Sequence, residues 1–202
     1  MSSQRKAGTP ETPVDAASHH DVARRDLLKC GCAALALLPV AGAAADPRSS
    51  RPQPNDLLVY MEGPRKGEVI AVSDLAVGDA PRFAYPMDPA TKTVRDGSRL
   101  NQILLVRLKP EHLSQKSASE SADGVIGMSA VCTHYGCQVT VLHESGRAVV
   151  CNCHGSTFDA GNQGEVLGGP AERRLAVLPL KAVDGSLAVA AGFKGRLGPP
   201  QQ

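Results

Sequence analysis

The sequence contains few aromatic residues and no tryptophan, although it is 202 residues long. Phe and Tyr together account for 3% of the residues, so a core must be built from Val, Leu, Ile and Ala. The chain also lacks an excess of charge of either sign, since its formal net charge is +2. A nucleic-acid-binding domain would need a basic patch and aromatic residues that stack on bases. We therefore expect no nucleic-acid partner.

A long apolar run is missing as well. The apolar segment 30–45 is interrupted by Pro39 and Gly42 and is shorter than the about 20 residues that a membrane-spanning helix needs. It follows Arg24-Arg25-Asp-Leu-Leu-Lys, and it ends in small residues at 43–45 that suit a cleavage site. This order resembles the twin-arginine export signals of bacteria. We expect residues 1–45 to direct the chain to the periplasm, with attachment to the inner membrane only if the signal stays uncleaved.

Two short segments carry the residues with recognisable chemistry. Each supplies one Cys and one His at metal-ligand spacing, together with a second Cys: Cys132-Thr-His134-Tyr-Gly-Cys137 and Cys151-Asn-Cys153-His154-Gly-Ser156. A [2Fe–2S] cluster in which two His replace two Cys on one iron needs two residues of each type. A structural zinc site usually has the spacing C-x2–4-C followed by H-x3–5-H. The mixed Cys–His pairs do not match that spacing, and zinc would leave two cysteines unexplained.

The two segments together resemble the Rieske iron–sulfur proteins. The resemblance implies one [2Fe–2S] cluster per chain, with Cys132 and Cys151 as ligands of one iron and His134 and His154 as ligands of the other. Neutral His in place of thiolate makes the cluster less negative and raises its reduction potential. Electron transfer is therefore the expected function, and no residue of the chain is expected to be catalytic by itself.

The same resemblance assigns roles to the residues around the cluster. It implies a disulfide between Cys137 and Cys153, which needs an oxidising compartment and favours the high-potential class of the family. Phe158 stands where many quinol-oxidising members have a Tyr that donates to a ligand sulfur, so the potential is expected to be lower than theirs. The other residues expected to surround the cluster are Ser156, which would donate to a sulfide, and Gly155, Gly136, Tyr135 and Pro170.

The 20 Gly and 15 Pro residues favour a loop-rich β protein. Short apolar runs predict strands at 57–60, 69–72, 102–108, 125–131, 139–143, 148–150, 174–180 and 187–191. Residues 111–124, rich in Ser and charge, predict a surface loop. The family resemblance adds the architecture, an all-β antiparallel sandwich with a small inserted cluster-binding lobe. The expected organisation is a linker at 46–56, a Rieske domain at 57–193 with its lobe at 130–171, and a tail at 194–202.

Three electron-transfer systems are compatible with these features. In arsenite oxidase, a small Rieske subunit carries electrons from a molybdenum subunit, whereas in cytochrome bc complexes the Rieske subunit oxidises quinol beside cytochrome b. Tyr135 and Phe158 stand where bc-type members usually have Leu and Tyr, and the segments 83–86 and 105–108 resemble the arsenite oxidase subunit, so the small subunit of arsenite oxidase is the favoured expectation. The segment 169–171 resembles the bc subunit, which is the alternative. We expect a catalytic oxidase subunit or cytochrome b as partner and a cytochrome c-type acceptor. A free-standing soluble carrier is the third alternative.

Overall fold

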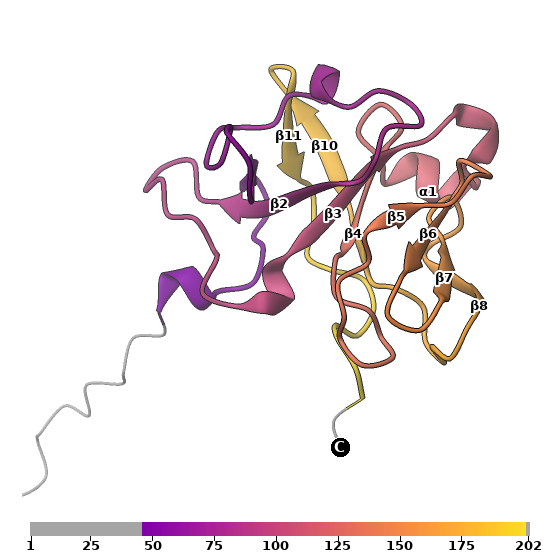
Figure 1. Cartoon of the computed structure of the whole chain (residues 1–202). Coiled ribbons are helices and arrows are strands. Elements are labelled where there is room, and N and C mark those ends of the chain that lie inside the picture. The colour runs from indigo at the N-terminus through magenta and orange to yellow at the C-terminus, as the bar shows by residue number, and fades with distance from the viewer. Residues whose placement is uncertain (1–45, 201–202) are drawn as a thin grey trace, which may run out of the picture. The chain divides into compact units, whose positions relative to one another are not determined.

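The computed structural model describes residues 46–200, so the expected export signal at 1–45 lies outside the described residues. Within the described part, two antiparallel sheets make up almost all of the regular structure (Figure 1), which confirms the predicted all-β class. No helix in residues 46–200 is both long and apolar enough to cross a membrane.

The large sheet has seven strands in the order β10-β11-β1-β2-β3-β4-β9. Their bounds are β1 (Leu57–Tyr60), β2 (Arg82–Met87), β3 (Ile103–Arg107), β4 (Val125–Ser129), β9 (Val177–Leu178), β10 (Leu180–Val183) and β11 (Ser186–Val189). The small sheet has the order β5-β6-β7-β8. Its strands are β5 (Val141–Leu142), β6 (Ala148–Cys151), β7 (Ser156–Asp159) and β8 (Glu165–Gly168). The small sheet lies within the inserted lobe that the family resemblance implied.

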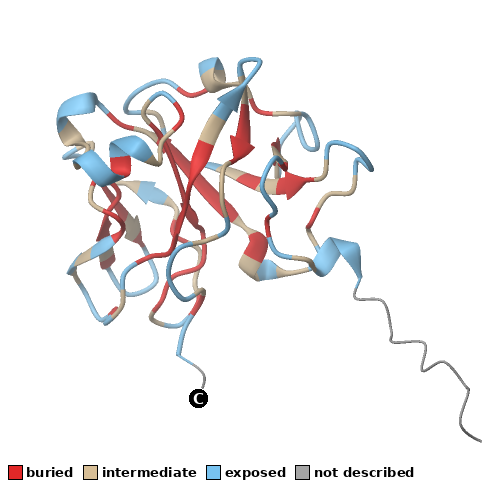
Figure 2. Cartoon of the chain, turned by 180° about the vertical axis from the view of Figure 1, so that it is seen from behind, coloured by how far each residue is buried: buried red, intermediate tan, exposed pale blue. Residues whose placement is uncertain are grey.

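Strand β3 is apolar on both faces because it contributes to two cores. Ile103 and Leu105 point into a core inside the large sheet. Leu104 and Val106 point into a second core, which also contains residues of the small sheet. Because successive side chains of a strand point to opposite faces, a strand buried on both sides reads as a continuous apolar run. The lack of alternation between apolar and polar residues in 102–108 therefore reflects the position of β3 between two cores. In Figure 2 this strand is a run of buried residues, coloured red.

The large sheet comes close to closing on itself. Its two edge strands, β9 and β10, follow each other in the chain with only Pro179 between them. Gly127 of β4 permits this approach, because a Cβ at that position would lie 3.0 Å from both the Leu178 carbonyl oxygen and the Leu180 side chain. The final hairpin is therefore β10–β11, and the segment 174–180 predicted as its first strand instead contains the separate strand β9.

The short helical elements lie in the connections. They are the 3-10 turns η1 (Pro47–Ser49), η2 (Val72–Asp74), η3 (Arg99–Asn101) and η4 (Pro110–His112), and the helix α1 (Gln115–Ser119). The strand predicted at 69–72 is reduced to isolated bridges before η2. The predicted surface loop 111–124 contains η4 and α1, and Ser117 in it is buried. The Ser114 hydroxyl accepts a hydrogen bond from the Ser117 N–H at 3.2 Å and so caps α1.

Residues 46–56, predicted as a linker, are fastened to the domain. Asp56 is 2% exposed and forms a two-bond ion pair with Arg95, at 2.6 and 3.0 Å. The buried Asn101 donates to the Ser50 carbonyl at 2.7 Å. At the other end, Lys194 pairs with Val177 as an isolated bridge. Residues from 51–54 and from 192–199 line one shared groove, so both ends of the described chain are packed against the domain.

Candidate metal centre

The first candidate loop, Cys132–Cys137, follows β4. Its ends are held together because the Cys132 N–H donates to the Cys137 carbonyl at 2.8 Å. The Gly136 N–H donates back to the Cys132 carbonyl at 3.0 Å, and Gly136 has a φ of 77°. Glycine adopts this left-handed conformation without the steric cost that other residues incur. The loop therefore turns back on itself and directs several side chains to one side.

The second candidate loop, Cys151–Ser156, is the turn between β6 and β7. Cys151 and Ser156 are paired across the two strands. The Gly155 N–H donates to the Cys151 carbonyl at 2.9 Å, and Gly155 has a φ of 74°. In both loops, then, a left-handed glycine four residues after the first Cys donates its N–H back to that Cys. The sequence spacing predicted that both loops bind metal. The structure shows in addition that the backbones of the two loops have the same conformation at this glycine.

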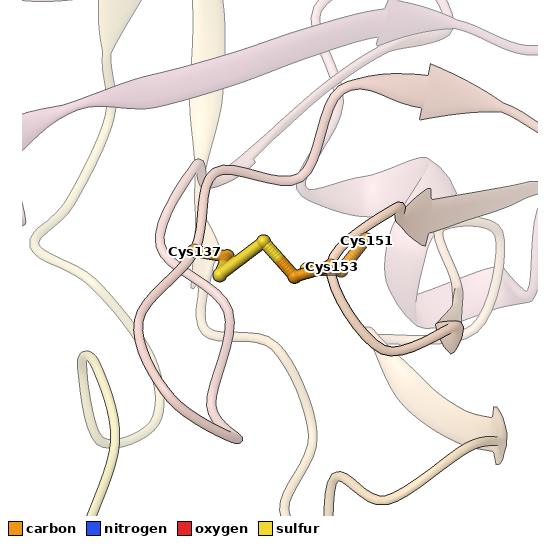
Figure 3. Close-up of side chains that lie close together, drawn as sticks. All are labelled: Cys137, Cys151 and Cys153. Atoms are coloured by element: carbon orange, nitrogen blue, oxygen red, sulfur yellow. A yellow bond between two sulfur atoms is a disulfide. The ribbon is translucent and has the colours of Figure 1, made fainter.

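A disulfide joins the two loops. Cys137 and Cys153 are bonded to each other, which confirms the predicted pairing. Figure 3 shows the bond crossing from one loop to the other, with Cys151 beside it. The sulfur atoms of Cys137, Cys151 and Cys153 all lie within 4.8 Å of one another. Because two of these three sulfurs are used in the disulfide, only Cys151 of this group is a free thiol.

The structure brings the four predicted ligand residues to the same place. Cys132 and Cys151 are free thiols and each is 1% exposed. The rings of His134 and His154 lie with their centroids 4.8 Å apart at an interplanar angle of 90°. His134 is half-buried and His154 is exposed. The site thus has two buried thiols on its inner side and two imidazoles toward the surface.

Two buried polar atoms at this site lack a partner among residues 46–200: His134 Nδ1 and Ser156 Oγ. Buried polar groups are normally satisfied, so this His and this Ser fit a site for a bound group. Burial raises the pKa of the Cys132 thiol, and the His134 N–H, at 3.5 Å from the Cys132 sulfur, opposes that rise in part. Metal binding replaces the proton of such a thiol. The donor set of two thiols and two imidazoles fits a mixed-ligand iron–sulfur cluster.

The remaining predicted residues surround these side chains. Tyr135 is 61% exposed, and its ring centroid lies 4.2 Å from that of His134 and 5.8 Å from that of His154. Phe158 is completely buried in the core that also contains Cys132 and Cys151.

The segment after β8 covers the second loop. A Cβ at Gly169 would lie 2.6 Å from the Gly155 carbonyl oxygen, so only glycine permits this approach. The next residue, Pro170, is exposed and lines a cleft of about 440 Å³. His134 and Tyr135 line the same cleft. The structure therefore places Pro170 beside the first loop, at the surface where the imidazoles lie.

Several contributors to the site were not predicted from the sequence. The Thr133 hydroxyl donates to the Arg173 carbonyl at 2.7 Å, and the Arg173 side chain donates to the Gly198 carbonyl at 2.9 Å. Pro199 and Pro200 form another wall of the cleft. Arg99 donates a hydrogen bond to the Gly136 carbonyl. These residues lie far from the two motifs in the sequence, so motif spacing carries no signal for them.

Comparisons with known proteins show which family the chain resembles. A family model of the Rieske [2Fe-2S] domain matches residues 92–179. The Rieske iron–sulfur subunit of the cytochrome bc1 complex from Streptomyces lividans is 31% identical over 147 residues, which cover 71% of this chain and 84% of that protein. The corresponding subunit from Streptomyces coelicolor is also 31% identical over 147 residues, but there the match spans 40% of the relative's length.

Among solved structures, the plasma membrane Rieske protein from Synechocystis PCC 6803 is 24% identical, with a TM-score of 0.40. That match covers 61% of this chain and 97% of the other.

The chain belongs to the Rieske iron–sulfur proteins, whose domain binds a [2Fe–2S] cluster. It is accordingly an electron-transfer protein.

Proposed function

We propose that Cys132 and Cys151 hold one iron of the cluster and that His134 and His154 hold the other. The support is the convergence of two buried thiols and two adjacent imidazoles from loops that a disulfide joins. When bound, the cluster accepts and releases one electron at a time. The buried cysteines would shield the iron that they hold from water, and the exposed His154 ring would present a hydrogen-bonding edge to a partner.

We further propose that the chain is the Rieske subunit of a quinol–cytochrome c reductase of the bc type. The observation that carries this proposal is the 31% identity that extends over 84% of a bc1 Rieske subunit. On this proposal cytochrome b is the neighbouring subunit, quinol is the electron donor and a cytochrome c-type protein is the acceptor. The sequence alone favours the arsenite oxidase subunit over the bc subunit, and this proposal reverses that preference.

The small subunit of arsenite oxidase remains the second candidate because of two residues at the site. Phe158 is fully buried in the core that contains the cluster cysteines, so no phenol hydroxyl is available at that position. Tyr135 places an exposed aromatic ring next to both histidines. Both features differ from what the bc-type resemblance predicts.

A gene deletion in the native bacterium separates these systems. Membranes and periplasm of the deletion strain would be assayed for cytochrome c reduction with the strain's own extracted quinol and, separately, with arsenite. The proposal predicts that the quinol-dependent activity is lost and returns with the parent gene but not with His154→Ser. Loss of the arsenite-dependent activity alone would establish the second candidate. Retention of both activities would contradict both and leave a free-standing carrier.

We also propose that residues 1–45 are a twin-arginine export signal and that the domain works in the periplasm. The disulfide supports this location, because structural disulfides persist in oxidising compartments. The paired arginines and the apolar segment behind them support the export route.

A further inference from the structure

The first cluster loop is contacted from outside by an arginine from a distant part of the chain. Arg99, at the start of η3, donates through Nη2 to the carbonyl oxygen of Gly136, which lies 37 positions later in the sequence. Gly136 is followed directly by Cys137 of the disulfide. This is the hydrogen bond that connects a cationic side chain to the backbone of the loop that carries Cys132 and His134.

The acceptor of this hydrogen bond lies in a protected position. Gly136 is buried, and a Cβ at this residue would lie 3.3 Å from Pro199 Cδ. A hydrogen bond from a charged donor is about twice as strong as one between neutral groups, and a low local dielectric strengthens it further. The bond to Arg99 is therefore able to hold the Gly136 carbonyl in one orientation.

The orientation of that carbonyl fixes the amide that follows it. The peptide unit is planar and trans, so the Gly136 C=O and the Cys137 N–H point in opposite directions. A carbonyl that points to Arg99 directs the Cys137 N–H away from Arg99. No backbone carbonyl of the described residues accepts a hydrogen bond from that N–H. Amides near a cluster that are free to bond to its sulfurs are among the groups that set its potential.

Arg99 projects from a rigid base. The neighbouring Asn101 is fully buried and donates to the carbonyls of Ser50, at 2.7 Å, and Arg95, at 3.0 Å. The Ser98 hydroxyl accepts from the Leu100 N–H at 3.3 Å and caps η3. The backbone position of Arg99 thus depends on the packing of the domain, and the hydrogen bond to Gly136 directs its side chain, which belongs to an exposed residue.

We propose that Arg99 is a positioning residue for the cluster, which it affects in two ways. Its hydrogen bond holds the Gly136–Cys137 peptide, and its positive charge favours the reduced, more negative state of the cluster. Both effects raise the reduction potential. The proposal concerns the cluster that the Rieske domain binds and does not depend on which complex the chain serves.

The test is a redox titration of the cluster-loaded protein, followed by electron paramagnetic resonance. Arg99→Ala is expected to lower the midpoint potential and to shift the g values, because it removes both the charge and the hydrogen bond. Arg99→Lys keeps the charge and one donor, and is expected to recover most of both shifts. Arg82→Ala is the matched control, because Arg82 is exposed at the start of β2 and its removal changes the net charge equally.

A midpoint potential and g values for Arg99→Ala that equal those of Arg82→Ala would overturn the proposal, because they would show that Arg99 acts as any surface charge does. If Arg99→Ala does not retain the cluster, Arg99→Gln and Arg82→Gln form the deciding pair. A lower potential for Arg99→Gln than for Arg82→Gln supports the proposal, and equal potentials refute it.

Discussion

Phe158 shares a buried core with Cys132 and Cys151, so a polar atom added to its ring would lie among the sulfur-bearing residues. We predict that Phe158→Tyr raises the midpoint potential, because a hydroxyl that donates to a ligand sulfur stabilises the reduced cluster. A net hydrogen bond of about 1 kcal/mol corresponds to roughly 40 mV for one electron. A redox titration measures the shift.

Phe83→Tyr is the control for this prediction. Phe83 packs against the same core from β2 but is only partly buried, so its added hydroxyl should leave the potential unchanged. An unshifted potential in Phe158→Tyr would mean that the hydroxyl does not reach a ligand sulfur. In that case the absence of Tyr at position 158 would no longer bear on the electron-transfer system.

The proposed ligand set is tested by making the same His-to-Cys substitution at two positions, one proposed as a ligand and one not. We expect His154→Cys to abolish the Rieske signal of the reduced protein in electron paramagnetic resonance, because thiolate would replace imidazole at the outer iron. His143→Cys should keep the signal, since His143 is exposed and bonds to Ser145 within the β5–β6 turn. A parental signal in His154→Cys would show that the ligands were wrongly assigned.

At the scale of elements, a buried ion pair is one of the contacts that hold residues 46–56 to the folded domain. We predict that Asp56→Ala destabilises the protein by about 3 kcal/mol, because it leaves the buried Arg95 guanidinium with only the more distant Asp88 carboxylate, at 3.9 Å. The midpoint of urea unfolding measures the loss.

Asp96→Ala is the control for this prediction, because it removes an ion pair of the same segment that lies at the surface. Asp96 pairs with Arg48 at 2.7 Å, but the Arg48 side chain is 60% exposed, so the expected loss is at most about 1 kcal/mol. Equal losses in the two variants would mean that segment 46–56 is not held by its buried pair.

The sequence predicts elements well where one local pattern decides them. The apolar runs at 57–60 and 102–108 match β1 and β3. The motif spacing predicted the metal-binding residue types of both loops, and the family resemblance implied the disulfide between them. Strands β2, β7 and β8 were not predicted as such. Strand β2 contains Arg82 and Pro86, β7 has polar residues on both sides of Phe158, and β8 has no fully buried residue. Pairing with neighbours rather than apolar content therefore makes these segments strands.

The contacts around the loops could not be predicted for a different reason. Arg99, the Arg173 carbonyl and Pro199 contact the first cluster loop through the tertiary fold, from positions that look like ordinary polar or loop residues in the sequence. The same holds for Asp56, which lies in a Pro-rich segment without an apolar pattern. A local pattern contains no information on such partners.

At the scale of the whole molecule, the large sheet can form fully only after its last strand, β11, has been synthesised. The first strand, β1, pairs with the last strand, β11, and the disulfide connects two loops in between. A domain that binds its cluster before export must therefore cross the membrane in the folded state. This requirement fits the twin-arginine route that we propose for residues 1–45.

We predict that the double variant Arg24→Lys, Arg25→Lys leaves the protein in the cytoplasm. Immunoblots of periplasmic and cytoplasmic fractions measure the distribution, and Arg5→Lys is the control because Arg5 lies in the same segment but outside the pair. Equal periplasmic amounts of the double variant and the parent would contradict the export route.

The groove shared by residues from 51–54 and from 192–199 also bears on protein engineering. Because segments near both ends of the domain line this groove, a peptide linker that starts and ends at these segments could join them in a circular permutant. The exposed Asp184-Gly185 turn between β10 and β11 offers a place for new termini. Pro200, the last described residue, lines the cleft beside His134, which makes the C-terminal side a poor place for an affinity tag. Fusions at that end would therefore crowd the cleft that His134 and Tyr135 line.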